Sequence, residues 1–212
     1  MAYPMSATTI EQALADVAEL YLGVGEVMAK RGPKNGVADE GGYWPDVKDT
    51  ADALDIMIQG MELVGMVPGK DTGISLDIAA SQFYGNSRYT VGERDYSTQE
   101  WIAYLVTSAE RITAAAGARE VDSVLVKVNQ TGTVSGGARA VAAARQADLS
   151  VIVSARSGET EDVSVAHLAV GWNADIVKLG SITRGERTAK WNELIRINEE
   201  LGGLPLAPVV SK

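Results

Sequence analysis

The sequence has no cysteine, one histidine and no long apolar segment. Without cysteine the chain can form no disulfide and no thiolate zinc site, and it has no cysteine nucleophile. Because His167 is the one histidine, a histidine-rich metal site or a Ser-His-Asp triad is hard to build. Acid/base chemistry in this chain therefore has to use carboxylates, lysines or tyrosines.

Asp, Glu, Lys or Gly interrupts each apolar run before it reaches the roughly 20 residues that cross a bilayer. The stretch MAYPMSATTIEQAL at the N-terminus has neither the basic nor the apolar segment of a secretory signal. We therefore expect a cytoplasmic protein. The net charge of −9 argues against binding to nucleic acid or to anionic membranes, which need a basic surface. A small anionic ligand would have to be held by a local cluster of cations.

With 46% hydrophobic and 22% charged residues, the composition is that of an ordinary globular protein. A chain of 212 residues is long enough for one substantial core. No linker or low-complexity run divides it, so residues 1–212 are expected to form a single domain with a poorly ordered tail over 203–212.

The N-terminal half predicts two amphipathic helices, because apolar residues recur at helical spacing in 8–30 and again in 48–66. Between them, NGVADEGGYWPDV is rich in glycine and turn-forming residues and predicts a loop with a short strand at its start. The elements expected next are a strand over 73–79, a hairpin-like stretch over 84–96 and a helix over 97–117.

From residue 123 onward, apolar strands alternate with amphipathic helices. The expected strands are 123–128, 150–153 and 174–179, and the expected helices are 134–146, 161–170 and 182–201. Such alternation is typical of parallel β/α units whose sheet is covered on both faces.

Polar residues collect at the expected C-terminal ends of these strands. Asp77, Lys127 and Lys178 each end a strand, and Arg156 lies just beyond another. A lysine at such a position can simply extend to solvent. Four such groups at equivalent strand ends favour a ligand site, because this edge is where parallel α/β folds bind ligands. The cations suit a phosphate or carboxylate, a lysine crowded by cations can act as a base, and Asp77 suits Mg²⁺.

Other polar residues have simpler explanations. His167 lies in a helical segment and is expected to pack there or to be partly exposed. Three carboxylates of the stretch SARSGETED lie at the start of a helix, so capping and the helix dipole account for most of their charge (Glu159, Glu161 and Asp162). The segment GTVSGGARA lacks the G-x-G-x-x-G spacing of a dinucleotide site.

Five segments resemble the C-terminal barrel domain of enolase, in the same order. They are DEGG (39–42), SLDIAASQFY (75–84), LVKVNQTGTVS (125–135), SARSGETED (154–162) and VKLGSITRGERTAKWNELIRINEELG (177–202). The motifs VNQ-x-G, RSGETED and ER-x-AK-x-N are long and specific. The resemblance implies an α/β fold, a TIM-like (β/α) barrel.

The resemblance also implies a chemistry. In the enolase family Mg²⁺ acidifies the carbon next to a carboxylate, a lysine removes its proton and a glutamic acid helps to expel the hydroxyl, which converts 2-phosphoglycerate to phosphoenolpyruvate. By motif, Lys127 resembles the base and Glu40 the acid. The remaining matches are a Mg²⁺ ligand (Asp77), a phosphate-binding pair (Arg156 and Ser157) and a substrate contact (Lys178).

The chain departs from the family pattern in several places. The resemblance implies a partial barrel that lacks the N-terminal capping domain and about two internal strands. Those strands would fall between TQEWIAYL (98–105) and VTSAERI (106–112), and they carry the other two Mg²⁺ ligands in the family. Asp77 is then one carboxylate where the family has three. Ala155 replaces the histidine of the family motif S-H-R-S-G-E-T-E-D.

Three hypotheses follow. The first is a Mg²⁺-dependent enolase-like lyase acting on 2-phosphoglycerate or on a related phosphono-acid. Its specialised form is a carboxyphosphonoenolpyruvate synthase of a phosphonate antibiotic pathway, which the change at Ala155 would fit. The second is a catalytically impaired remnant that binds an anion or a protein partner, and the third is a partial or deleted reading frame.

Five or six strands are too few for a regular eight-stranded barrel. Either the sheet stays open, or a second chain covers its edge. We therefore expect a homo-oligomer.

Overall fold

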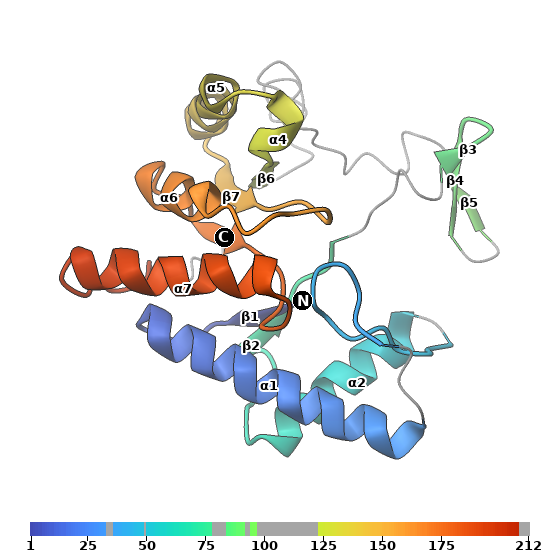
Figure 1. Cartoon of the computed structure of the whole chain (residues 1–212). Helices are drawn as coiled ribbons and strands as arrows, with labels where there is room; N and C mark the ends of the chain where they lie inside the picture. The colour runs from blue at the N-terminus through green and yellow to red at the C-terminus, as the bar shows by residue number, and fades with distance from the viewer. Residues whose placement is uncertain (33–35, 49, 78–83, 92–93, 97–122, 208–212) are drawn as a thin grey trace. The chain divides into compact units, whose positions relative to one another are not determined.

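The computed structural model describes residues 1–32, 36–48, 50–77, 84–91, 94–96 and 123–207 (Figure 1). The chain forms two compact units. The first unit comprises residues 1–76, 155–167 and 179–212, and the second comprises residues 77–154 and 168–178. The two units are described in turn.

Two long helices form most of the core of the first unit, as the sequence predicted. Helix α1 covers Ile10–Arg31 and α2 covers Thr50–Leu63. The Thr9 side chain caps α1 by accepting a hydrogen bond from the Gln12 N–H at 3.2 Å. Helix α1 ends at Gly32, whose φ of 139° is open to glycine and strained for other residues.

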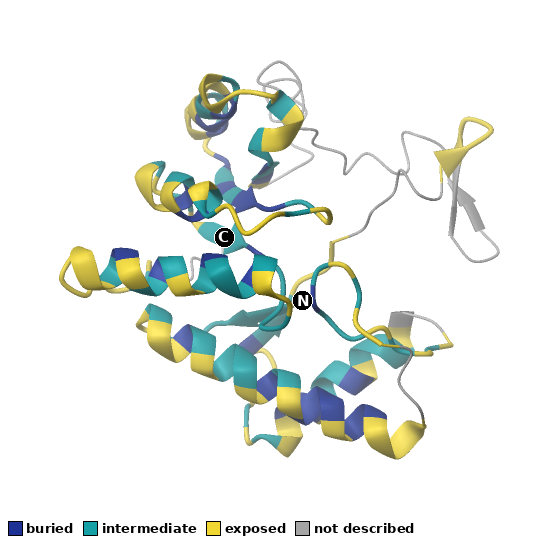
Figure 2. Ribbon diagram, viewed as in Figure 1, coloured by how far each residue is buried: buried dark blue, intermediate teal, exposed yellow. Residues whose placement is uncertain are grey.

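Helices α1 and α2 pack closely because glycines lie where they cross. A Cβ atom added to Gly23 would lie 2.7 Å from the carbonyl oxygen of Gly60, and one added to Gly60 would lie 2.5 Å from Val24 Cγ2. Figure 2 shows the buried residues along the facing sides of the two helices. They form one apolar cluster: Leu20, Val24, Val27, Met28, Ile56 and Met61.

A short antiparallel pair joins the start of the chain to residues 72–74. Strand β1 (Ala2–Pro4) pairs with β2 (Thr72–Ile74), with Ala2 opposite Ile74. Met1 and Ser75 continue the pairing by one residue, because the Met1 amino group donates to the Ser75 carbonyl at 2.7 Å and the Ser75 N–H donates to the Met1 carbonyl at 2.9 Å. Of the strand predicted over 73–79, β2 includes residues 73 and 74, residues 76 and 77 lie beyond the pairing, and residues 78 and 79 lie outside the described residues.

The last helix, α7 (Gly185–Glu200), packs against α1 within the first unit. The Asn198 amide donates to the Glu11 carboxylate at 2.9 Å, and the Leu206 N–H donates to the Thr8 carbonyl at 3.0 Å. The end of the chain is thus attached to its beginning. Of the tail expected over 203–212, residues 208–212 lie outside the described residues.

The second unit contains the parallel sheet that the alternating pattern predicted. Its strand order is β6-β7-β8, formed by Ser123–Val126, Ser150–Ser154 and Ile176–Lys178. The register places Val126 beside Val153 and Ser154 beside Lys178. The described part of the chain is therefore α/β with an open parallel sheet and no closed barrel, consistent with the partial barrel expected.

Helices follow the strands as expected. Helix α5 (Val134–Gln146) connects β6 to β7 and packs on both strands, after the single turn α4 (Val128–Thr131). Helix α6 (Ser164–Gly171) lies between β7 and β8 in the sequence. The strand valines facing the core have no exposed surface, which is typical of a parallel sheet: Val124, Val126, Val151 and Val153.

The predicted hairpin-like stretch forms three antiparallel strands. These are β3 (Tyr84–Gly85), β4 (Arg88–Val91) and β5 (Arg94–Tyr96). Asn86 and Ser87 connect the first two strands with φ values of 51° and 61°, as a tight hairpin turn requires. The helix predicted over 97–117 lies outside the described residues. No helix in the described ranges is long and apolar enough to cross a membrane.

Candidate functional site

Three of the predicted site residues form one charged group at the carboxyl ends of the strands in the second unit. Lys178 is the last residue of β8, and Lys127 follows β6 directly. Lys178 Nζ lies 2.7 Å from Asp77 Oδ2, although the two residues are 101 positions apart. The Lys178 side chain is 11% exposed and that of Asp77 is 36% exposed. The ion pair is therefore partly shielded from water.

The charges of this group act on one another. Burial of the Asp77 carboxyl opposes its ionisation, but the hydrogen bond and charge of Lys178 and the charge of Lys127 outweigh it. The pKa of Asp77 consequently lies below its ordinary value. Asp77 is a fixed negative charge that holds Lys178, and Lys127 is close enough to contribute to its potential.

Asp77 was also expected to be a ligand of Mg²⁺. Among the described residues, no group of three or more His, Asp or Glu side chains could hold a metal ion. The Asp77 carboxylate is already paired with Lys178. Because Mg²⁺ takes about six oxygen ligands in near-octahedral geometry, the described side chains do not by themselves fit this ion.

The other three predicted residues lie on two loops of the first unit. Arg156 and Ser157 belong to the loop of residues 155–160, called the Arg156 loop below, and Glu40 belongs to the loop of residues 38–42, called the Glu40 loop. The Arg156 side chain is half-buried and Ser157 is exposed. Within the described part of the chain, no side chain pairs with the Arg156 guanidinium. Such a cation is available to an anionic ligand.

The backbone of the Arg156 loop is held from within by two cations of α7. Arg187 is 1% exposed and donates to the carbonyls of Arg156 at 2.8 Å and Ser157 at 2.6 Å. Lys190 has no exposed surface, donates to the Thr160 carbonyl at 2.7 Å and lies 3.2 Å from Glu159 Oε2.

The carboxylates of the SARSGETED stretch therefore have different roles. Their charge was expected to come mostly from capping of the helix that follows and from its dipole. Asp162 does cap α6, since its Oδ1 accepts a hydrogen bond from the Ser164 N–H at 2.8 Å. Glu159 instead accepts from the Arg156 N–H at 2.7 Å and pairs with Lys190. Its charge is used inside the loop, and to that extent the capping explanation is wrong.

The Glu40 loop is fixed to the segment that precedes α7. The Ser181 N–H donates to the Glu40 carbonyl at 2.7 Å, and the Thr183 hydroxyl donates to the Gly41 carbonyl. Gly41 has a φ of 81°, and a Cβ atom there would lie 2.5 Å from the Thr183 carbonyl oxygen. Only glycine fits this position without strain. Arg187 reaches this loop as well, at the Asp39 carbonyl.

Sequence reasoning missed the roles of Arg187 and Lys190. The buried residues of α7 are Arg187, Lys190, Leu194 and Ile197, which follow one another at helical spacing. The sequence did carry a signal for their burial, because the two cations of the motif ER-x-AK-x-N lie on the same helical face as the apolar residues that follow. His167 fits its simple explanation, because it is exposed and its Nε2 lies 2.7 Å from Glu193 Oε1.

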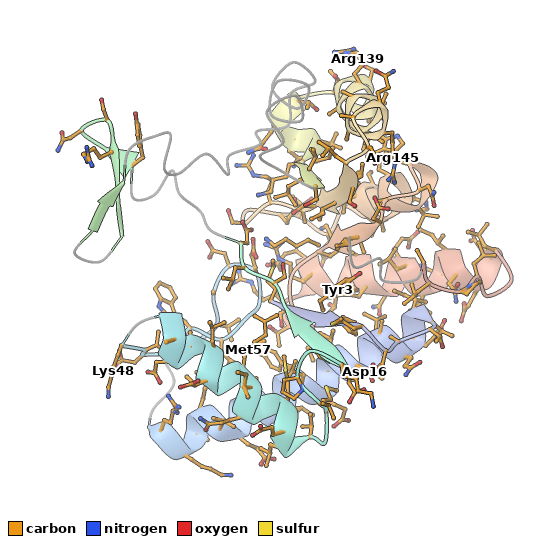
Figure 3. All side chains as sticks on the ribbon, turned by 180° about the vertical axis from the view of Figure 1, so that it is seen from behind. Tyr3, Asp16, Lys48, Met57, Arg139 and Arg145 are labelled. Carbon is orange, nitrogen blue, oxygen red and sulfur yellow. The ribbon has the colours of Figure 1, made fainter. Side chains whose placement is uncertain are left out.

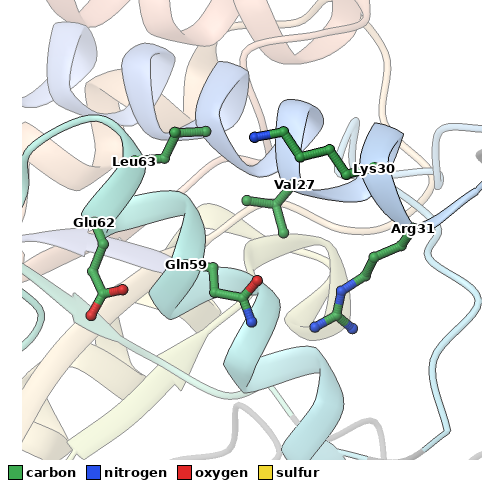
Figure 4. A pocket seen from close by; sticks show the side chains of 6 residues that line it. All are labelled: Val27, Lys30, Arg31, Gln59, Glu62 and Leu63. Carbon is green, nitrogen blue, oxygen red and sulfur yellow. The ribbon is translucent and has the colours of Figure 1, made fainter.

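A surface cavity of about 410 Å³ lies between α1 and α2 (Figure 4). Its lining consists of Val27, Lys30, Arg31, Gln59, Glu62 and Leu63. None of the six predicted site residues contributes to it. The candidate residues of the first unit therefore lie on the Glu40 and Arg156 loops, and those of the second unit form the charged group of Asp77, Lys127 and Lys178, outside this cavity.

Parallel strands joined by helices, with Lys127 and Lys178 at their carboxyl ends, are typical of α/β proteins that bind ligands at this edge, among them the (β/α) barrels. The model of the enolase C-terminal TIM barrel domain matches residues 1–104 and 102–206. An enolase of Beutenbergia cavernae is 32% identical over 245 aligned positions, which cover 95% of this chain. The chain belongs to the enolase family. It spans 58% of the length of that relative.

Proposed function

We propose that this chain is an enolase-like lyase that acts on a small phospho- or phosphono-acid. The observation that carries the proposal is the group of Lys178, Asp77 and Lys127 at the carboxyl ends of parallel strands. Two cations at this edge of a parallel sheet suit an anionic ligand, because the carboxyl ends of parallel strands are where such folds bind ligands.

In the proposed reaction, the neutral amine of Lys127 takes a proton from the carbon next to the substrate carboxylate. The electrons of the broken C–H bond form an enolate, whose added negative charge lies on the carboxylate oxygens. Lys178, held in place by Asp77, supplies a positive charge for these oxygens. Collapse of the enolate forms the C=C bond and expels hydroxide, which leaves as water after receiving a proton. Glu40 is proposed as the donor of that proton, with Arg156 and Ser157 as the phosphate-binding pair.

The test is an assay for the absorbance of the enol-phosphate product, with 2-phosphoglycerate and with phosphono-acid analogues, across a Mg²⁺ series. Lys127→Ala is compared with Lys48→Ala, which changes an exposed lysine outside the site (Figure 3). We expect Lys127→Ala to lower kcat by about 10²–10⁴-fold, as loss of a general base does, and Lys48→Ala to leave it unchanged. Equal activity of the two variants would exclude the proposed role of Lys127.

Two other functions remain as proposals. The pairing of Asp77 with Lys178, instead of an arrangement for a metal ion, favours a protein that binds an anion without turning it over. Saturable phosphate binding without turnover of any three-carbon phospho- or phosphono-acid would support that function. The buried Ala155, in place of the family's histidine, fits an altered substrate, and the proposed form of that change is a carboxyphosphonoenolpyruvate synthase. Turnover of the phosphono-acid alone would support this second alternative.

A further inference from the structure

Arg187 is a buried cation that bonds main-chain carbonyls in place of a carboxylate among the described residues. The residue is 1% exposed, and its guanidinium donates to three carbonyls. Together with a backbone hydrogen bond and Arg184, its charge lowers the pKa of the neighbouring Glu186. In the described part of the chain no carboxylate lies within ion-pair distance of it, and its Nε has no hydrogen-bond partner. Lys190, one turn further along α7, differs because it is paired with Glu159. A buried charge ordinarily has a counter-charge, so the unpaired state of Arg187 calls for a functional explanation.

The three carbonyls belong to both candidate loops of the first unit. Nη1 bonds the Arg156 carbonyl, and Nη2 bonds the carbonyls of Ser157 and Asp39. The planar fork of arginine can bond acceptors in several directions at once, whereas a lysine amine is a compact point charge on a flexible stem. Space for this side chain depends on Gly180, since a Cβ atom there would lie 2.6 Å from Arg187 Cδ.

These bonds determine what the Arg156 loop presents to a ligand. Carbonyl oxygens repel anions, and Arg187 engages those of Arg156 and Ser157. The half-buried Arg156 side chain and the exposed Ser157 hydroxyl are then the groups left to meet an anion. The positive charge of Arg187 lies within hydrogen-bond distance of the main chain that carries them.

We propose that Arg187 is a positioning residue that fixes the Arg156 loop and the Glu40 loop together and, by its unpaired charge, strengthens binding of a phosphate-type anion at Arg156 and Ser157. This inference rests on the proposed function, which assigns the anion to that pair. Arg187 contacts the loop backbone and not the ligand, on which it acts by holding the loops and by its charge.

The experiment uses the full chain and inorganic phosphate as the probe. Wild type, Arg187→Lys and Arg187→Met are compared with Arg196→Met, which removes an exposed arginine from the same helix. Phosphate affinity is measured by calorimetry, and amide hydrogen exchange is followed in peptides covering residues 38–42 and 155–160. We expect both Arg187 variants to lose protection in both loops, with α1 unchanged, because neither has the guanidinium fork. Arg187→Met, which also removes the charge, should bind phosphate at least tenfold more weakly than wild type and more weakly than Arg187→Lys. Arg196→Met should behave as wild type.

Several results would overturn the inference. Wild-type phosphate affinity in a folded Arg187→Met protein would remove the anion part. Loss of protection spread evenly over the chain, or confined to one loop, would contradict the positioning part. If Arg187→Met does not fold, Arg187→Gln, which also removes the charge, takes its place. If wild type binds no phosphate, the proposed anion site and the anion part fail together, whereas joint loss of protection in the two loops would still support positioning.

Discussion

Tyr43 joins the Glu40 loop to the helical part of the first unit. Its ring stacks on that of Tyr21 in α1, with the centroids 4.2 Å apart and the planes 16° from parallel. Burial of the phenol, reinforced by Tyr21, raises the pKa of Tyr43 to about 12. Because Tyr43 follows Gly42 directly, this stack restrains the C-terminal end of the Glu40 loop. It adds to the hydrogen bond that Thr183 donates to Gly41.

The raised pKa predicts a stability change in alkali. The folded state favours neutral Tyr43, so its contribution is complete below the ordinary pKa of about 10 and is lost as the pH rises through about 12. Wild type should therefore lose more unfolding free energy between about pH 9 and about pH 12 than Tyr43→Phe, as measured by urea denaturation. Tyr84→Phe, at an exposed tyrosine, is the control and should follow wild type. Parallel curves for wild type and Tyr43→Phe would contradict the prediction.

At individual residues, the sequence predicted locations better than partners. The end of a strand is visible in the apolar pattern, so Lys127 and Lys178 could be placed at the ligand-binding edge before the structure was known. The pairing of Lys178 with Asp77 depends on how distant segments meet. The same holds for Arg187, whose carbonyl acceptors lie about 30 and about 150 positions away, beyond the reach of periodicity.

Among the elements, the crossing of α1 and α2 depends most directly on single residues. Gly23 and Gly60 let the two backbones approach until an added Cβ would contact the opposite helix. Glycine costs a helix about 1 kcal/mol relative to alanine. The close crossing of the two helices offsets that cost by burying the apolar cluster around Leu20 and Met61.

Gly23→Ala should destabilise the protein although alanine is the better helix former. The added methyl group would lie 2.6 Å from Val64 Cγ1 and 2.7 Å from the Gly60 carbonyl oxygen. Overpacking of this kind costs about 1–3 kcal/mol. The control is Gly171→Ala at the end of α6, where nothing lies within 4 Å of an added Cβ. Urea denaturation should show a loss for the first variant and none for the second. A Gly23→Ala protein as stable as wild type would show that the helices can separate at no cost.

Tertiary contacts explain where element boundaries differed from their predictions. Helix α7 was expected from residue 182 but begins at Gly185, because Ser181 and Thr183 bond the Glu40 loop and Arg184 has a φ of 74°. Helix α6 begins at Ser164 instead of residue 161, after the cap formed by Asp162. Apolar periodicity locates the body of a helix, whereas its ends follow hydrogen bonds to distant segments.

For the whole molecule, the sheet is the feature with the widest consequence. The described residues supply three parallel strands, whereas a closed barrel of this family type has eight. Parallel strands are ordinarily covered on both faces, and unpaired edges invite pairing with another chain. We therefore propose that the protein is a homo-oligomer.

Light scattering coupled to size-exclusion chromatography tests this proposal. The expected mass is at least twice the chain mass of 22.4 kDa. The mass should persist on dilution and at high salt, because an interface that covers apolar sheet does not depend on exposed ion pairs. A mass of one chain at every concentration would contradict the proposal.

The attachment of α7 to α1 has a consequence for biosynthesis. A ribosome releases α1 and α2 early, but Asn198, which bonds Glu11, emerges 187 residues after its partner. Until then the nascent chain must hold an apolar helical pair whose partner does not yet exist. The chain has no cysteine, so no disulfide can hold α1 during this interval. We expect a chaperone that shields α1 until α7 has emerged to raise the yield of folded protein.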